Sequence, residues 1–357
     1  MYFDVVIAGG SVAGLICARE IASNNHSVLV IEEDYEIGTP EHCGGLVSTA
    51  GLEELGIVPF RKTFDHLIES ADIHAPNGNS FSINSKKQKV AEISRRELDK
   101  QIAHQAQKNG AIIKVRTSFQ EATEKGVRTS EGEIECKIFV DARGVSSLIH
   151  KDRTGILSSA QYEIYADWIK KGKVQVFFDQ EKYPGFFAWV IPSDEGKGKV
   201  GVAGKGINVV EAIEKFLDTM GNYSTIRKIY APIWIKGPIE KFIDGKIVII
   251  GDAAGQAISK FLESKDMSDL EEYQKKWTEK FGKEFEKQLF ARKILERLDN
   301  NTINKLFESI TPEITKEISE KEDFDFHTGS IVKLLGIKGS LKTAQAIIGG
   351  EFKKLLS

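Results

Sequence analysis

Near its start the chain alternates between apolar runs and one amphipathic stretch. Residues 3–8 form a short continuous apolar run, which is typical of a buried parallel strand. A glycine-rich turn follows, and residues 12–24 have the spacing of a helix before a second apolar strand at residues 27–32. Strand, turn, helix and strand in this order predict a βαβ unit.

Further along, the pattern predicts short strands of a second kind. Between residues 60 and 90 apolar and polar positions alternate around an Asn77-Gly78 turn, which indicates a hairpin. A helix is expected over 94–109, with strands on its C-terminal side. The expected strands are 111–117, 134–141, and then an antiparallel set at 174–178, 186–191 and 200–204 with a polar loop at 193–199.

The last third of the chain has a different pattern. Residues 247–250 form one more buried apolar strand. Beyond Ala257 the chain is rich in Lys and Glu with helical periodicity, so we expect an amphipathic helical region. The whole pattern predicts an α/β fold with a Rossmann-like domain, an antiparallel-sheet domain and a C-terminal helical region.

Composition and charge exclude several classes of protein. The 357 residues are 41% hydrophobic and 28% charged, with a net charge of −3, so no basic field points to nucleic acid. No apolar run is long enough to span a bilayer, and the first ten residues read as a strand rather than a secretory signal. We therefore expect a cytoplasmic protein. Cys17, Cys43 and Cys136 have no CxxC spacing, which argues against a metal site or a disulfide framework.

The first turn has the chemistry of a dinucleotide site. It reads Gly9-Gly10-Ser11-Val12-Ala13-Gly14, a GxGxxG pattern with Ser11 at the second glycine. The helix that follows offers free N–H groups and a partial positive charge to a pyrophosphate. Glu32, at the end of the second strand, is in register to accept hydrogen bonds from the ribose hydroxyls. The alternative is a glycine turn in an unrelated α/β protein.

A second motif lies far downstream, at residues 245–255. A buried strand runs into Gly251-Asp252-Ala253-Ala254-Gly255. GxGxxG together with GDAAG resembles the flavoprotein group that contains aromatic hydroxylases and geranylgeranyl reductases. The resemblance implies FAD, with Asp252 on the ribityl chain, Gly251, Ala253 and Gly255 near the pyrophosphate, and Glu33 beside Glu32. A plain strand-to-helix turn is the alternative.

Two further segments match that group. Arg95 and Asp99 resemble its R-x-x-[FL]-D helix start, whose arginine lies near the FAD pyrophosphate. The alternative is a solvated surface helix. Asp141-Ala142-Arg143-Gly144 resembles D-A-D-G, but Arg143 replaces the second aspartate, so that aspartate's role is not carried over.

Two motifs point to the geranylgeranyl reductase branch. One is His42-Cys43-Gly44-Gly45, similar to the C-G-G segment of the branch; the other is the stretch 184–192 with Val200-Gly201-Val202, similar to its P-G-x-[YF]-x-W-x-[FI]-P…VGV hairpin. Phe187 and Trp189 are two residues apart and share a face, so they could wall an apolar tunnel with Phe177 from a neighbouring strand. Ordinary sheet core is the alternative reading of each ring.

The resemblance implies a reaction and its participants. It implies an FAD-dependent reductase, of the type found in archaea, that hydrogenates isolated prenyl double bonds of geranylgeranyl lipids or geranylgeranyl diphosphate. Cys43 is the first candidate for the proton donor and His42 a weaker one, with Gly44 and Gly45 passing the backbone close to the flavin. The reductant, NADPH or reduced ferredoxin, stays open. An FAD-dependent monooxygenase or halogenase of the same fold is the main rival; a non-catalytic electron carrier and a degenerate binding protein are others.

The resemblance also divides the chain. An FAD-binding domain is expected over 1–60, 91–160 and 245–262, a substrate domain over 61–90 and 161–244, and a helical region over 263–357. Lipid substrates imply peripheral contact with a membrane, for which 331–335 and 352–356 are candidates unless they pack on the protein. One departure stands out: Gln256 runs directly into Ala257, where the family has a Pro- and Gly-rich loop and a longer helix. Either a segment is missing from this sequence or the deletion is real.

Overall fold

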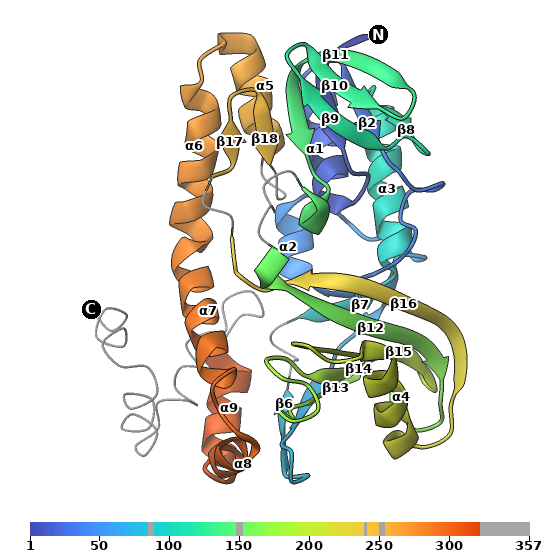
Figure 1. Ribbon diagram of the computed structural model, residues 1–357, viewed down its shortest axis with the longest axis vertical. Helices are drawn as coiled ribbons and strands as arrows, with labels where there is room; N and C mark the ends of the chain where they lie inside the picture. The colour runs from blue at the N-terminus through green and yellow to red at the C-terminus, as the bar shows by residue number, and fades with distance from the viewer. Residues whose placement is uncertain (85–88, 148–152, 239–240, 250–253, 322–357) are drawn as a thin grey trace.

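The computed structural model describes residues 1–84, 89–147, 153–238, 241–249 and 254–321 (Figure 1). Three sheets organise the described chain, and helices α6 and α7 follow one another along the length of the molecule (Figure 1). The predicted combination of a parallel sheet, a largely antiparallel sheet and a helical C-terminal region is confirmed.

The first sheet is built on the predicted βαβ unit. Strand β1 pairs in parallel with β2 on one side and β11 on the other, and β8 and β18 extend the parallel set. The hairpin β9–β10, which the sequence pattern did not predict, joins β11. The bounds of its strands are β1 Tyr2–Ala8, β2 Val28–Ile31, β8 Ile112–Lys114, β9 Phe119–Thr123, β10 Gly126–Thr129, β11 Gly132–Asp141, β17 Ile243–Asp244 and β18 Ile247–Ile249.

Helices cover one face of this sheet. Apolar residues of α1, α3, α5 and α6 form one core with the side chains on one face of β1, β2 and β11. These strands are apolar on both faces, so the opposite face also needs a cover. The hairpin β9–β10 packs on the other face. The helices are α1 Val12–Ser23, α3 Arg95–Lys108, α5 Ala254–Ser264 and α6 Ser268–Trp277.

The second sheet carries the motif-bearing hairpin. Its order is β16-β12-β15-β14-β13-β5-β6, antiparallel except where β13 pairs in parallel with β5. The predicted loop over 193–199 is wrong, since β14 and β15 continue into it and leave a short turn at Glu195 and Gly196. The strands are β5 Ser70–His74, β6 Ser80–Asn84, β12 Ile156–Tyr165, β13 Lys173–Phe177, β14 Ala188–Asp194, β15 Lys197–Gly204 and β16 Ser224–Trp234.

A small third sheet contacts β14 of the second sheet through β4 and β7. Its order is β3-β7-β4, and the central strand β7 leads directly into α3. The proposed domain boundary at residue 160 falls inside β12, which pairs with β16 along its whole length and with β15 from Ser158 onward. The strands are β3 Leu46–Ser48, β4 Phe64–Leu67 and β7 Val90–Ile93.

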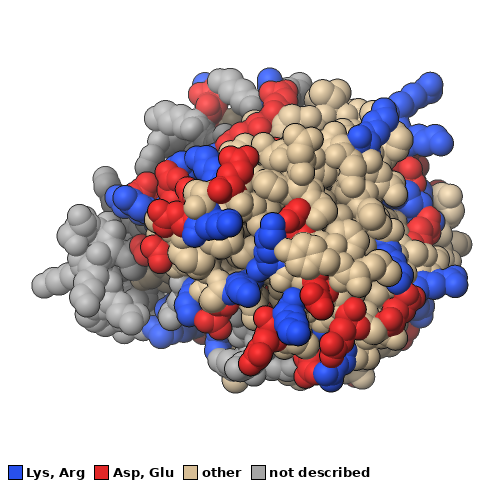
Figure 2. Space-filling view, turned by 90° about the horizontal axis from the view of Figure 1, so that it is seen from above, with Lys and Arg blue, Asp and Glu red and all other residues tan. Residues whose placement is uncertain are grey.

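The remaining helices are short or lie after residue 208. Helix α4 covers one face of the second sheet through Ile213, Phe216 and Leu217. A π-helical stretch, η3, joins α6 to α7. The bounds are α2 Thr49–Glu54, η1 Gly144–Ser146, η2 Arg153–Gly155, α4 Val209–Met220, η3 Thr278–Gly282, α7 Lys283–Leu295, α8 Asn300–Glu308 and α9 Pro312–Lys321. On the face seen in Figure 2, cations and anions are interspersed rather than segregated.

Candidate functional site

The first turn requires its glycines. Gly9 has φ +112°, and a Cβ there would lie 2.5 Å from the carbonyl oxygen of Ala142. A Cβ on Gly14 would lie 2.1 Å from the carbonyl oxygen of Gly9, so α1 and β1 could not approach so closely with any side chain at that position. Ser11 is the N-cap of α1, is exposed and makes no capping hydrogen bond with its side chain. The helix N-terminus is thus open to an anion.

Glu32 lies where a ribose-binding carboxylate should be. It directly follows β2 and accepts hydrogen bonds from the backbone N–H of Gly10 at 2.7 Å and of Asp34 at 3.0 Å. These bonds fix the carboxylate beside the glycine turn while each oxygen keeps a further lone pair. Glu33 is exposed.

The start of α3 meets the glycine turn. The carboxyl group of Asp99 receives a backbone hydrogen bond from Val12 and lies 3.6 Å from the guanidinium of Arg95. Burial raises the pKa of Asp99 to about 6, although Arg95 opposes the shift. The structure therefore brings the Arg95–Asp99 helix start against the glycine turn at the N-terminus of α1. Arg95 is half-buried, which is not the position of a solvated surface residue.

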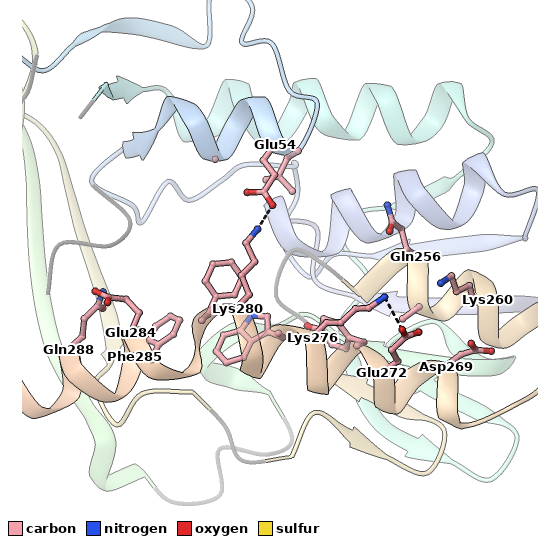
Figure 3. A pocket seen from close by; sticks show the side chains of 16 residues that line it. Glu54, Gln256, Lys260, Asp269, Glu272, Lys276, Lys280, Glu284, Phe285 and Gln288 are labelled. Carbon is pink, nitrogen blue, oxygen red and sulfur yellow. Dashed lines mark hydrogen bonds and ion pairs between the residues drawn. The ribbon is translucent and has the colours of Figure 1, made fainter. Parts of the chain in front are cut away.

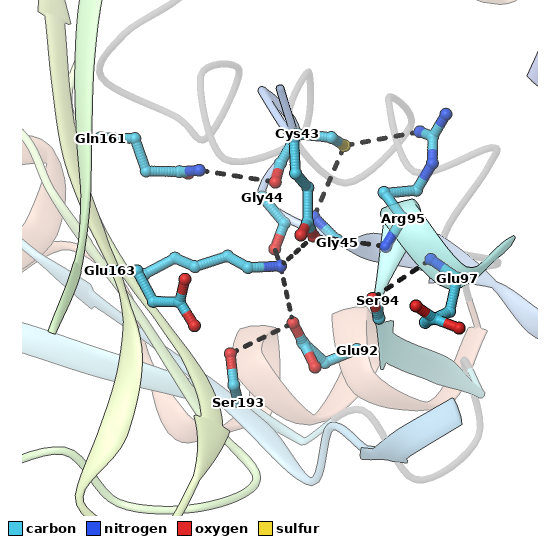
Figure 4. Close-up of polar contacts among 12 residues, drawn as sticks. Cys43, Gly44, Gly45, Glu92, Ser94, Arg95, Glu97, Gln161, Glu163 and Ser193 are labelled. Atoms are coloured by element: carbon cyan, nitrogen blue, oxygen red, sulfur yellow. Dashed lines mark hydrogen bonds and ion pairs between the residues drawn. The ribbon is translucent and has the colours of Figure 1, made fainter. Parts of the chain in front are cut away.

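Arg95 also reaches the Cys-Gly-Gly segment (Figure 4). Its Nη1 donates a hydrogen bond to Cys43 Sγ at 3.6 Å, and the backbone N–H of Gly45 donates to the same sulfur at 3.4 Å. A guanidinium and an amide N–H aimed at sulfur stabilise negative charge on it. Cys17 and Cys136 have no such setting: both are buried, and burial raises the pKa of Cys136 to about 11 and that of Cys17 further still.

The two glycines after Cys43 allow close packing between sheets. A Cβ on Gly44 would lie 2.6 Å from Ile191 Cδ1, and Gly45 has φ +90° with its Cα facing the carbonyl oxygen of Ile93. The segment is thereby pressed between β14 of the second sheet and β7 of the third. Gly44 and Gly45 act here through their lack of side chains.

A buried charge cluster, which the sequence analysis did not predict, contacts the Cys-Gly-Gly segment through Lys199. Lys199 Nζ lies 3.0 Å from Glu41 Oε1 and 3.1 Å from Glu92 Oε1, and it donates to the carbonyl oxygen of Gly44 at 3.4 Å. Arg227 bridges Glu41 at 3.3 Å and Glu163 at 3.2 Å. The contributing positions fall on five separate segments, so no local pattern could have revealed the cluster.

The cluster holds more carboxyl groups than cations, and its pKa values reflect this. Burial, together with a hydrogen bond that the protonated Glu92 donates to the Asp65 carboxylate, raises the pKa of Glu92 to about 8. Burial alone would raise the pKa of Glu41, but the charges of Lys199 and Arg227 outweigh it and lower that pKa. Glu41 is therefore the anion that pairs with Lys199, and Glu92 is the carboxyl group that holds a proton near neutral pH.

Trp189 is linked to the Cys43 segment by one amide side chain. Gln161 accepts a hydrogen bond from Trp189 Nε1 at 3.1 Å and donates to the carbonyl oxygen of Cys43 at 3.4 Å. The indole lies against Gly201, where a Cβ would be 2.2 Å from the ring. Phe187 is 6.2 Å from Trp189 between ring centroids. The two predicted aromatic residues are thus together, beside the Cys-Gly-Gly segment.

Phe177 lies elsewhere. It pairs with Ala188 whereas Trp189 pairs with Val176, so Phe177 and Trp189 face opposite sides of the sheet. Its ring stacks on His74 at 4.3 Å and contacts Phe216 of α4 at 5.0 Å. The expectation that Phe177 shares a wall with Phe187 and Trp189 is not supported, because one residue of register separates the two faces.

The second flavin motif is only partly described. Gly251, Asp252 and Ala253 lie outside the described residues. Gly255 lies in α5 against the middle of α1, where a Cβ would be 2.7 Å from Glu20 Cβ and 3.1 Å from the carbonyl oxygen of Cys17. Gly255 therefore lies at a contact between α5 and α1. Helix α5 runs through Gln256 and Ala257 without interruption, so the structure accommodates a direct junction.

Arg143 makes a local ion pair. It binds the Asp141 carboxylate with two nitrogens, each at 2.9 Å, and lies over the ring of Phe119. This arrangement differs from the family pattern, which has an aspartate here.

A groove of about 570 Å³ runs between α2, α5 and the α6–α7 column (Figure 3). Its wall is aromatic at Trp277, Phe281 and Phe285, and its rim carries ion pairs of Lys276 with Glu272 and of Lys280 with Glu54. None of the predicted site residues lines it. The junction residues Gln256 and Ala257 do, so the groove opens where the family pattern has additional chain.

The residues present fit FAD where the structure describes them. The glycine turn is a cradle that side chains would fill, the Ser11 side chain makes no capping bond at the α1 N-terminus, and Glu32 is fixed beside it. Among the described residues, no helix combines the length and apolarity needed to cross a bilayer.

Comparisons with known proteins agree with this geometry. The family model described as lycopene cyclase protein matches residues 4–163. The structure is similar to that of a geranylgeranyl bacteriochlorophyll reductase-like protein from Thermoplasma acidophilum, with a TM-score of 0.82, 20% identity, and coverage of 97% of this chain and 99% of that one. Flavin-dependent halogenases and an FAD-dependent monooxygenase share the fold at TM-scores of 0.59 to 0.65.

Two curated relatives each cover more than two thirds of the chain. A digeranylgeranylglycerophospholipid reductase of Methanopyrus kandleri is 28% identical, covering 88% of this chain and 91% of its own length. Another from Methanosphaera stadtmanae is 31% identical over 278 positions, covering 71% of this chain and 69% of its own length. Since 71% of 357 residues is about 253, that relative carries residues with no counterpart here. The chain belongs to the digeranylgeranylglycerophospholipid reductase family.

Proposed function

We propose that this protein binds FAD and hydrogenates isolated prenyl double bonds of geranylgeranyl lipids. One observation carries the proposal: Cys43 lies in hydrogen-bond contact with Arg95, whose partner Asp99 holds the N-terminus of α1, while Gln161 connects the same segment to Trp189. The cofactor turn, the candidate acid and the aromatic wall are thus one connected site. The relatives' names supply the class of lipid.

The chain's residues would hold FAD at one end of the first sheet. The N–H groups of the Gly9–Gly14 turn would receive the pyrophosphate and Glu32 the ribose, while Asp252 of the second motif would take the ribityl chain. Reduced flavin supplies a hydride to one alkene carbon when bound. The other carbon needs a proton, and the protein must deliver it, since an isolated alkene has no neighbouring carbonyl group to accept charge.

Cys43 would deliver that proton. Its S–H bond breaks as the new C–H bond forms, and the electron pair stays on sulfur. The guanidinium of Arg95 and the N–H of Gly45 stabilise the resulting thiolate, which then regains a proton from solvent. Overall, one hydride and one proton convert a double bond to a single bond.

Trp189 and Phe187 would orient the prenyl chain. The hydrogen bonds through Gln161 fix the indole relative to the Cys43 backbone, so an alkene packed on the rings is held at a constant distance from the sulfur. Apolar rings also exclude water from the site. NADPH, reduced ferredoxin or another low-potential donor would supply the electrons, and peripheral contact with the membrane would give access to the lipid.

The test is anaerobic turnover. Purified protein, loaded with FAD and reduced with dithionite, is incubated with geranylgeranyl glycerophospholipid, and products are read by mass spectrometry. We expect masses that increase in steps of two hydrogens and reoxidation of the flavin by the lipid. Reoxidation only on admission of oxygen, with an oxygenated or halogenated product, would instead identify the monooxygenase-type rival.

A further inference from the structure

One short segment exposes four large apolar side chains within ten residues. Val58, Phe60, Phe64 and Leu67 are 79%, 54%, 37% and 50% exposed. Single exposed apolar residues are common on protein surfaces, but four within ten residues mark an interaction surface. We call residues 58–67 the apolar segment.

Buried hydrogen bonds hold the apolar segment in place. The side chain of Gln101 on α3, only 3% exposed, accepts from the Phe60 backbone N–H at 2.9 Å and from Thr63 Oγ1 at 3.0 Å, and it donates to the Val58 carbonyl at 2.7 Å. The backbone N–H of Ser94 donates to the carbonyl oxygen of Thr63 at 2.9 Å. The inner side of the segment is thus fully tied down, and its apolar side chains project outward from a fixed backbone.

A β-bulge sets the direction of two of these side chains. Phe64 pairs with Ile93 and Leu67 with Ala91, because the register shifts between Phe64 and His66. Ile93 and Ala91 are two residues apart on β7, so Phe64 and Leu67 lie on the same face of the small sheet. Without the extra residue they would point to opposite faces.

Two cations lie between Phe60 and Phe64 in the sequence. Arg61 and Lys62 are exposed and have no ion-pair or hydrogen-bond partner within the described parts of the chain. The segment's acidic residue, Asp65, is hydrogen-bonded to the buried Glu92. Aromatic and aliphatic side chains with adjacent free cations match the boundary of an anionic bilayer, where rings enter the interface and cations meet lipid phosphates.

The apolar segment is close to the proposed reaction site. It ends in β4, one outer strand of the β3-β7-β4 sheet, and the Cys-Gly-Gly segment leads into β3, the other outer strand. Two strand spacings amount to about 10 Å. A lipid leaving a bilayer at the apolar segment would have a short path to Cys43.

We propose that the apolar segment is the surface through which this protein contacts an anionic phospholipid bilayer. The inference deepens the proposed function, because it states where a membrane lipid reaches the enzyme. The candidates at 331–335 and 352–356 lie outside the described residues.

The test uses the full chain and vesicles of phosphatidylcholine, with and without phosphatidylglycerol, in a co-sedimentation assay. We expect binding to the anionic vesicles only. Phe60→Ser with Phe64→Ser should weaken it at least tenfold, since two rings lose their burial. Arg61→Gln with Lys62→Gln should weaken it up to about thirtyfold, and salt should weaken the wild type. Val210→Ser with Ile226→Ser, equally exposed positions far along the chain, should leave binding unchanged.

Equal vesicle binding by wild type and both segment variants would overturn the proposal. So would a wild-type dimer in light scattering that the Phe60→Ser/Phe64→Ser variant converts to a monomer without any vesicle binding, since the surface would then bind a second copy. Turnover of detergent-dispersed lipid should be the same in all variants. If the wild type reduces no prenyl lipid at all, the proposed function fails while the vesicle result still decides this proposal.

Discussion

The guanidinium of Arg95 donates a hydrogen bond to the sulfur of Cys43 over 3.6 Å. Resemblance had assigned Arg95 to a pyrophosphate and Cys43 to proton transfer, as separate features. Because of this contact, the start of α3 is placed to stabilise negative charge on the sulfur of the candidate acid.

Replacing Arg95 tests that control. Arg95→Gln removes a charge-assisted hydrogen bond from the sulfur, so we expect alkene reduction to fall about ten- to hundredfold. The rate should be measured anaerobically over a range of pH, because a change in its pH profile separates an effect on proton transfer from a loss of FAD. FAD content is read from visible absorbance. An unchanged rate with FAD retained would remove Arg95 from the site's chemistry.

Cys43→Ser tests the proton donor itself. The variant should keep FAD but lose about 10²- to 10⁴-fold in alkene reduction, the usual contribution of a positioned general acid. Cys136→Ala is the matched control, since Cys136 is buried in the first sheet and remote from the motif, and it should retain turnover. Wild-type turnover by Cys43→Ser would show that another group donates the proton.

Lys199→Met tests the buried charge cluster. The change leaves Glu41 and Glu92 without their shared cation, and we expect the free energy of unfolding to drop by about 3–5 kcal/mol in urea denaturation. Adding Glu41→Gln should recover part of the loss, because it removes a buried anion that has lost one of its two cations. Lys215→Met, which breaks an exposed pair with Glu211, should change stability by no more than about 0.5 kcal/mol. Similar losses for the two lysines would contradict the structure.

Glu92 gives the cluster a pH dependence with a definite sign. In the folded protein its pKa is raised from 4.5 to about 8. Between these values the folded state keeps the proton and the unfolded state releases it, so the contribution of Glu92 to stability is present below the lower pKa and is lost as pH rises through the upper one. Urea midpoints from about pH 5 to about pH 9 should fall in the wild type more than in Glu92→Gln. Parallel curves for the two proteins would show that Glu92 ionises normally.

The sequence pattern was informative where local rules suffice. The predicted strands, turn and helix of the βαβ unit are present as β1, α1 and β2, since apolar runs and helical periodicity report burial directly. The Asn77-Gly78 hairpin is present between β5 and β6. Boundaries were less certain: the residues at 193–199 are polar because they form an exposed hairpin end, and polarity alone does not separate strand from loop there.

Motifs in the sequence identified the glycine turn and the Cys-Gly-Gly segment, and their resemblance to a known flavoprotein group identified the family, because in this chain the close backbone contacts of Gly9, Gly14, Gly44 and Gly45 leave no room for a side chain. Tertiary structure decided what surrounds them. Lys199, Glu41 and Glu92 come together only when the second and third sheets pack. Phe177 faces the side of the sheet opposite to Trp189 because of the strand register. Gln101 of α3 holds the apolar segment through hydrogen bonds. Contacts between residues far apart in the chain depend on register and packing, which a single strand or helix pattern does not contain.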